Sequence, residues 1–164
     1  MKKIIKKLTV LSVCMCMMGG MAVSVSAKNT IKTTHNSGRV LNVHTWNNPS
    51  AGNRISVYDN LGGNDQRWVL KGQSPELYFL CAANQRLALA CGGDYNAYLE
   101  NYNEIYGDWQ RHSLKHVYGN VWEIPNKGAG YYERLYVISG NKGEMVRYGY
   151  PGLETLDTVR WEIK

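Results

Sequence analysis

The segment Gln66-Arg67-Trp68-Val69-Leu70 returns twice further along the chain, as Gln110-Arg111-His112-Ser113-Leu114 and as Val159-Arg160-Trp161-Glu162-Ile163. Each copy has an arginine followed directly by a tryptophan or a histidine. Recurrence of one segment along a chain is the sequence signature of an internally repeated fold. These copies therefore decide the fold, provided that the residues around them repeat as well.

The residues upstream of each copy do repeat. Ile55 stands 13 residues before Trp68, and Leu99 stands 13 residues before His112. Met145-Val146-Arg147-Tyr148 precedes the third copy. Still further upstream, a strand–turn–strand pattern starts near Ile31, Leu77 and Val121, at intervals of 46 and 44 residues. The second strand of each pattern contains a leucine: Leu41, Leu87 or Leu135. The tryptophan or histidine of the same copy follows this leucine by 27, 25 and 26 residues, respectively.

The pattern as a whole predicts an all-β chain. Segments of helical period are nearly absent, and short apolar runs alternate with turns rich in Gly, Asn and Pro. Three copies of four short strands are the pattern of a β-trefoil. We expect a single domain over residues 28–164, with repeats at about 28–74, 75–118 and 119–164.

The repeated segment also resembles a known family. Gln66-Arg67-Trp68, preceded by Gly62-Gly63-Asn64-Asp65, is similar to the Q-x-W signature of ricin B-chain-like lectin domains. The other two copies resemble eroded forms of it, and the resemblance covers nearly all of residues 28–164. It implies a β-trefoil lectin that binds carbohydrate without catalysis, each repeat being able to supply one shallow sugar site.

The resemblance assigns the sugar-binding roles most completely in the first repeat. They fall on Asn42, Tyr58, Asp65 and Gln66, with Tyr58 as the aromatic that stacks on the sugar ring. Asn42 stands where the family has an acid and Asp65 where it has an amide, so acid and amide are exchanged. A neutral amide loses the stronger charge-assisted hydrogen bond, which puts a galactose-type specificity in question.

The second and third repeats keep less of the pattern. The second offers Tyr102 and Gln110, and the third offers Tyr148. The alternative for all three tyrosines, including Tyr58, is cross-strand packing on a half-exposed sheet. Trp68, His112 and Trp161 are expected to fill the shared core, where a buried histidine needs a hydrogen-bond partner.

The first residues predict secretion. Lys2, Lys3, Lys6 and Lys7 precede an apolar stretch that ends in the small residues Val25-Ser26-Ala27, as in a signal peptide cleaved after residue 27. The lysine-rich start is typical of bacterial signals, and a membrane anchor or a lipoprotein are the alternatives. The chain carries +6, but without those lysines 15 basic and 13 acidic residues leave +2. That charge excludes a nucleic-acid-binding class that rests on net basicity.

Two cysteines remain after residue 27, Cys81 and Cys91. An even number of cysteines in an exported chain favours a disulfide. Two free thiols are the alternative, because neighbouring hairpin strands can leave the pair out of register. Neither cysteine has a metal-ligand or catalytic spacing.

Nothing in the sequence indicates an enzyme, a cofactor or a metal site. The histidines His35, His44, His112 and His116 form no recognised catalytic or metal motif. We expect carbohydrate, such as host or cell-surface glycans, as the partner, and no membrane span. The alternative is a protein-binding trefoil, such as an accessory or receptor-binding subunit of a secreted toxin or a protease inhibitor. Tyrosines are enriched at protein interfaces, and the loops are rich in them: Tyr95, Tyr98, Tyr106, Tyr131 and Tyr132.

Overall fold

The computed structural model describes residues 27–35, 38–45, 48–105, 107–130, 132–150 and 153–164. The predicted signal peptide therefore lies outside the described residues, except for Ala27. The described chain forms short strands and the 3₁₀ helices η1 (Asn64–Gln66), η2 (Asp108–Gln110) and η3 (Leu153–Val159). This confirms the prediction of an all-β chain. Among the described residues, no helix has the length and apolar character needed to cross a membrane.

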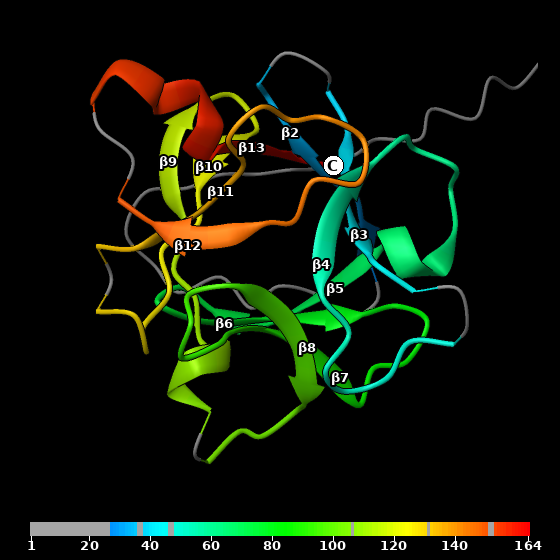
Figure 1. The fold of residues 1–164 in the computed structure, drawn as a ribbon. Helices are drawn as coiled ribbons and strands as arrows, with labels where there is room; N and C mark the ends of the chain where they lie inside the picture. The colour runs from blue at the N-terminus through cyan, green and yellow to red at the C-terminus, as the bar shows by residue number, and fades with distance from the viewer. Residues whose placement is uncertain (1–26, 36–37, 46–47, 106, 131, 151–152) are drawn as a thin grey trace, which may run out of the picture.

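The strands form two large antiparallel sheets and one hairpin (Figure 1). The first sheet has, in order, β1 (Lys28–Asn29), β5 (Trp68–Gln73), β6 (Glu76–Cys81), β7 (Leu87–Cys91) and β8 (Ala97–Asn101). The second has β4 (Ile55–Tyr58), β3 (Val40–Val43), β2 (Ile31–Thr33), β13 (Arg160–Ile163), β10 (Val121–Glu123) and β9 (Lys115–Tyr118). The hairpin pairs β11 (Arg134–Tyr136) with β12 (Arg147–Gly149).

Backbone hydrogen bonds join these pieces where β4, β8 and the chain just before β12 meet. Val57 N donates to Glu144 O over 2.9 Å, and Val146 N donates to Ile55 O over 2.9 Å. Ala97 N in turn donates to Val146 O over 3.1 Å. The three pieces therefore enclose one core, and Figure 1 shows the 3₁₀ helices at three separate corners around them.

The core is filled by apolar side chains that alternate between the two faces of each strand. In β6, Leu77, Phe79 and Cys81 belong to the main apolar cluster, whereas Tyr78 and Leu80 belong to a smaller cluster on the other face. Successive side chains of a strand point to opposite faces, so a strand that is apolar throughout must be covered on both. This is why β6 is buried from Leu77 to Cys81.

The aromatic residues of the repeated segment lie at the centre of the main cluster. Trp68 and Trp161 have no exposed surface. Their indole nitrogens donate to the carbonyl oxygens of Leu41 (3.3 Å) and Leu135 (2.8 Å). These are the leucines at the matched spacings in the sequence, so the spacing corresponds to a direct hydrogen bond. Each bond supplies the polar partner that a buried indole requires.

His112 takes the third such position and is also fully buried. Its Nε2 lies 2.8 Å from the Tyr148 hydroxyl and 3.2 Å from the Asn126 amide nitrogen. Burial lowers the pKa of His112 to about 4, because the charged imidazolium would lose its hydration. The imidazole is therefore neutral at physiological pH and forms part of the core.

The predicted disulfide is wrong in this structure, where Cys81 and Cys91 are buried free thiols. The cause is the register of the hairpin that carries them. Leu80 of β6 pairs with Ala88 of β7, so Cys91 lies opposite Leu77 at the far end of β6. The offset along the strands is about 13 Å at 3.3 Å per residue, beyond the roughly 7 Å between Cα atoms that a disulfide spans.

Candidate functional site

One cavity of about 230 Å³ opens beside β3, the end of β4 and η1. It is lined by Asn42, His44, Thr45, Tyr58, Leu61, Asp65 and Gln66. The structure thus brings together the residues assigned to the first repeat, Asn42, Tyr58, Asp65 and Gln66. Small-molecule sites are concave and combine apolar walls with a few convergent polar groups, which is the composition of this lining.

Strand pairing and one glutamine position these groups. Asn42 lies in β3 opposite Ser56 of β4, and Tyr58 is the last residue of β4. Gln66 is 1 % exposed. Both the nitrogen and the oxygen of its side-chain amide form hydrogen bonds with the backbone of the loop that follows Tyr58. Its Nε2 donates to Asp59 O (2.8 Å), and its Oε1 accepts from Leu61 N (2.8 Å). Gln66 therefore shapes the loop that forms the cavity wall.

The amide of Asn42 is also engaged within the protein. Its Nδ2 donates to Val43 O over 2.9 Å and to Ser56 Oγ over 3.3 Å. These bonds use both amide protons and orient the group, which leaves Oδ1 as its remaining polar atom. Asn42 is thus an acceptor in the cavity.

Tyr58 is half-buried and held from the side by charged residues of another part of the chain. Lys142 Nζ lies 4.4 Å from the centre of its ring and 3.0 Å from Asp59 Oδ2. Arg39 Nε lies 3.0 Å from Asp59 Oδ1. The hydrogen bond from Lys142, followed by that from Arg39, lowers the pKa of Asp59. The ring is therefore a fixed aromatic plate beside a neutralised carboxylate.

Sequence reasoning did not select His44, Thr45 and Leu61 as part of the site. His44 follows Asn42 by two residues, so extended backbone puts both side chains on the same side, and this signal was available. Leu61, 75 % exposed, lies in the loop bonded by Gln66 between Tyr58 and Asp65. Its place at the cavity depends on the path of that loop, which no periodicity in the sequence predicts.

No protein-family model and no curated protein matches the sequence. Solved structures do match. A designed three-fold symmetric protein, ThreeFoil, is 20% identical with a TM-score of 0.69, over 83% of this chain and 96% of that one. The Vibrio vulnificus hemolysin/cytolysin β-trefoil lectin with N-acetyl-D-lactosamine bound is 19% identical with a TM-score of 0.63, over 84% and 93%. The chain is a β-trefoil.

A further similar structure is the Macrolepiota procera ricin B-like lectin in complex with lactose. It is 16% identical to this chain, with a TM-score of 0.66, over 88% of this chain and 99% of that one. At this identity the likeness concerns the fold. Two of these trefoils are lectins by description, and this trefoil has its cavity in the first of its predicted repeats.

The second repeat of this trefoil has a different arrangement. A cavity of about 380 Å³ is lined by Ala51, Glu100, Asn101, Asn103, Gly107, Trp109 and Gln110. Gln110 repeats the bonding of Gln66, because its Nε2 donates to Asn101 O (2.8 Å) and its Oε1 accepts from Asn103 N (2.9 Å). Tyr102 is absent from the lining and packs edge-on against Tyr78, with ring centres 5.0 Å apart. The predicted pair Tyr102 and Gln110 is therefore split.

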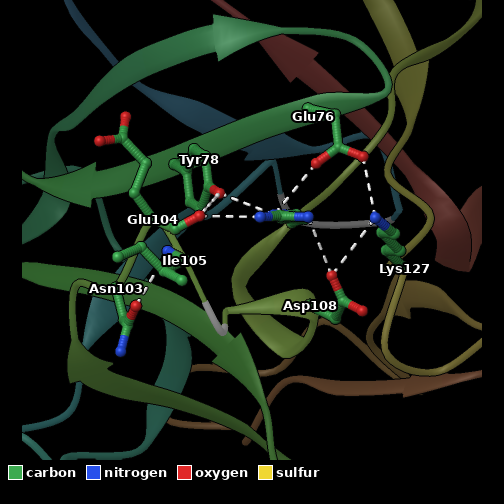
Figure 2. A network of polar contacts seen from close by, with 8 residues as sticks. Glu76, Tyr78, Asn103, Glu104, Ile105, Asp108 and Lys127 are labelled. Carbon is green, nitrogen blue, oxygen red and sulfur yellow. Dashed lines mark hydrogen bonds and ion pairs between the residues drawn. The ribbon is translucent and has the colours of Figure 1, made fainter.

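An ionic network anchors the η2 helix beside this second cavity. Arg111 Nε lies 3.0 Å from Glu76 Oε2, and Arg111 Nη1 lies 3.1 Å from Asp108 Oδ1. Lys127 bridges the same carboxylates at 2.9 and 3.3 Å. Figure 2 shows Glu76 and Tyr78 of β6, Asp108 of η2 and Lys127 gathered around this network. The network joins residues of the second and third predicted repeats.

Tyr148, the candidate from the third repeat, is not in a site. It is 2 % exposed, and its hydroxyl bonds His112 in the core. Burial raises the pKa of Tyr148 well above its ordinary value. A ring without an open face cannot stack on a sugar, so the assignment of Tyr148 as a binding residue is wrong. Its role is to give His112 a partner.

The described residues contain no group of three or more His, Cys, Asp or Glu side chains that could hold a metal ion. The charged groups around the first cavity are engaged in ion pairs, except for Asp65, for which no ion pair or hydrogen bond is found among the described residues. The side chains that line this cavity can form hydrogen bonds and stack against a ring.

Proposed function

We propose that this protein is a carbohydrate-binding, lectin-like module whose sugar site is the cavity formed by Asn42, Tyr58 and Asp65. The observation that supports this most is that residues assigned from the sequence line one cavity of about 230 Å³. Sugars present hydroxyl groups and one apolar C–H face. Here Asn42 Oδ1 and Asp65 accept from the hydroxyls, and the Tyr58 ring packs on the C–H face. The lectin neighbours, described with lactose and N-acetyl-D-lactosamine, support the same class of ligand.

A glycan array probed with residues 28–164 tests this proposal. We expect hits that disappear in Tyr58→Ala, because the stacking plate is lost, while the melting temperature changes little. Tyr118→Ala is the matched control, since Tyr118 is a 55 % exposed tyrosine of β9 away from the cavity. A blank array from folded protein, or hits unchanged in Tyr58→Ala, would contradict the assignment.

We further propose that the module is secreted after cleavage behind Ala27. The lysine-rich start and the small residues Val25-Ser26-Ala27 support this. Mass spectrometry of protein from the culture medium of a bacterial host should then give a chain that starts at Lys28. A product that keeps residues 1–27 and remains with the membrane fraction would contradict it.

A protein-binding trefoil is the second candidate, and one loop supports it. Tyr95 is 48 % exposed and has φ of 59°, a conformation that is uncommon for a bulky residue. The loop is fixed by Asp94, whose carboxylate accepts from Tyr98 Oη (2.8 Å) and from Asn96 Nδ2 (2.5 Å). A pull-down that loses its partner in Tyr95→Ala but not in Tyr58→Ala would favour this function over sugar binding.

A further inference from the structure

Three polar groups assigned to the sugar site in the first repeat, those of Asn42, Asp65 and Gln66, present acceptors rather than donors to the cavity. Both amide protons of Asn42 are used on Val43 O and Ser56 Oγ, so its oxygen faces the cavity alone. Gln66 is bonded to the loop through both ends of its amide. A carboxylate only accepts hydrogen bonds, so Asp65 adds two more acceptor atoms. A ligand that binds the Asn42 oxygen and the Asp65 carboxylate has to supply the donors.

The carboxylate of Asp65 also stands out by its charge. Of the carboxylates beside the two cavities, Asp59 is paired with Arg39 and Lys142, and Asp108 is paired with Arg111 and Lys127. Glu100, in the lining of the second cavity, accepts a hydrogen bond from Gln110 Nε2 at 3.3 Å. Asp65 lines the cavity, and no described cation lies within ion-pair distance of it. The ammonium of Lys142 is nearby over the Tyr58 ring, but it is engaged by Asp59 at 3.0 Å. Asp65 is thus an unneutralised negative charge in an acceptor-rich cavity.

We propose that this cavity takes hexosamines with a free amino group in preference to their N-acetylated forms. The inference rests on the proposed sugar-binding function and adds the chemical class of the sugar. An ammonium group has three donors and a positive charge, which matches Asp65 and the oxygen of Asn42. An acetamido group is neutral and adds a carbonyl acceptor, whereas both amide protons of Asn42 are already used within the protein. A hydroxyl is intermediate, because it both donates and accepts.

Matched sugars that differ at one substituent test this preference directly. Galactosamine, galactose and N-acetylgalactosamine carry an ammonium, a hydroxyl and an acetamide at the same carbon, and the gluco series repeats the comparison. Each is titrated into the chain near neutral pH at low salt, and binding is followed by NMR shifts of the Asp65 and Tyr58 amides. We expect the amine to bind about three- to five-fold tighter than the hydroxyl sugar, as for a partly exposed ion pair. The acetamide should bind weakest, and high salt should shrink the advantage of the amine.

Two variants trace the preference to Asp65. In Asp65→Asn the ratio of amine to hydroxyl affinity should fall to about one, whereas Asp157→Asn, a surface change in η3, should leave the ratio as it was. Gly63→Ala keeps the charge, but the added methyl group would clash with Asp65 Oδ1, so we expect a reduced ratio there too. Circular dichroism and melting temperatures check that each variant is folded.

The outcomes separate this inference from the proposed function. If galactose binds and galactosamine binds no tighter, the sugar site stands and the inference falls. A preference for the amine that survives Asp65→Asn overturns the inference in the same way. If no sugar of either series binds to folded protein, the proposed function and the inference fall together.

Discussion

His112 is the residue through which the stability of the core depends on the pH of the solution. It occupies the position of a buried tryptophan in the other two repeats, and it faces Phe79, Tyr148 and Asn126 within the core. Its close polar neighbours among the described residues are neutral groups, and burial outweighs the backbone hydrogen bonds with Gln110 and Leu77 that favour the charged form. The pKa of His112 of about 4 lies below its value in an unfolded chain, about 6.5.

This difference predicts that stability decreases with acid. Between about pH 6.5 and pH 4 the unfolded state binds a proton that the folded state does not, so the free energy of unfolding falls as the pH falls. The decrease attributable to His112 is about 3 kcal/mol at most. Urea unfolding at a series of pH values measures it.

Matched variants separate His112 from the other titrating groups. His112→Gln should flatten the slope between pH 6.5 and 4, although it is less stable at pH 7. His116→Gln, a change at an exposed position on β9, should keep the slope. Because burial of His112 is the cause, an unchanged slope in His112→Gln would refute this account.

The residues of the site were only partly predictable from sequence, and Tyr148 explains why. Tyr58, Tyr102 and Tyr148 occupy equivalent places in the repeats, yet one lines a cavity, one packs on Tyr78 and one is buried. The outcome depends on what the neighbouring repeat supplies, such as His112 for Tyr148. Such a partner lies far away in sequence, so motif position alone cannot identify it.

At the scale of the element, hairpin register decided what the sequence left open. The spacing of Cys81 and Cys91 allowed either a disulfide or two thiols. The pairing of Leu80 with Ala88 places the two cysteines too far apart along the strands for a disulfide. Burial raises the pKa of Cys91 to about 12 and also raises the pKa of Cys81. A thiol with a raised pKa and no access to solvent is unreactive.

This predicts a simple pattern of thiol labelling for residues 28–164. Native protein should react negligibly with a thiol reagent at slightly alkaline pH, and protein unfolded in urea should show both cysteines free. A reducing agent should leave the melting temperature unchanged. Unfolded, unreduced protein that shows no free thiol would demonstrate a disulfide and contradict the register.

The ionic network on η2 is a second feature that the sequence alone did not predict, because its residues come from different elements. Arg67, Arg111 and Arg160 stand at equivalent positions of the repeated segment. Arg111 contacts Glu76, Asp108 and the Tyr78 hydroxyl together. Single exposed ion pairs contribute little, but a network around one guanidinium contributes more. We expect Arg111→Ala to lower the free energy of unfolding by more than the loss of a single surface ion pair does.

Chemical denaturation tests this comparison. Arg160→Ala is the control and should lose less, because the described part of the chain gives Arg160 one ion pair, with Asp157 at 3.2 Å. A loss in Arg111→Ala no larger than in the control would mean that the network adds nothing beyond one surface pair.

The whole molecule was easier to predict than its parts. The recurring spacings indicate a threefold arrangement, and the physical basis is visible where Trp68 and Trp161 bond the carbonyls of Leu41 and Leu135. A repeated core demands repeated apolar residues at fixed intervals, and those survive in the sequence. Surface cavities are under no such demand, so the copies are free to differ there.

That freedom predicts one sugar site per molecule. The cavity with Tyr58 keeps an aromatic plate with acceptors around it, whereas Tyr102 is packed on Tyr78 and Tyr148 is in the core. A single shallow site of this size should bind a monosaccharide with a Kd on the order of millimolar, about −4 kcal/mol. Titration should therefore reach a stoichiometry of one sugar per chain.

Strong attachment to a surface would then depend on the number of chains that are held together. Fused to a tetrameric coiled coil, the module should bind dense glycan surfaces at least 100-fold more tightly than the monomer does, and the gain should vanish in Tyr58→Ala. Surface plasmon resonance on sparse and dense glycan layers measures both effects. Tight binding by the monomer to a dense layer would instead indicate further sites on the same chain, with the cavity beside Trp109 as the first place to substitute.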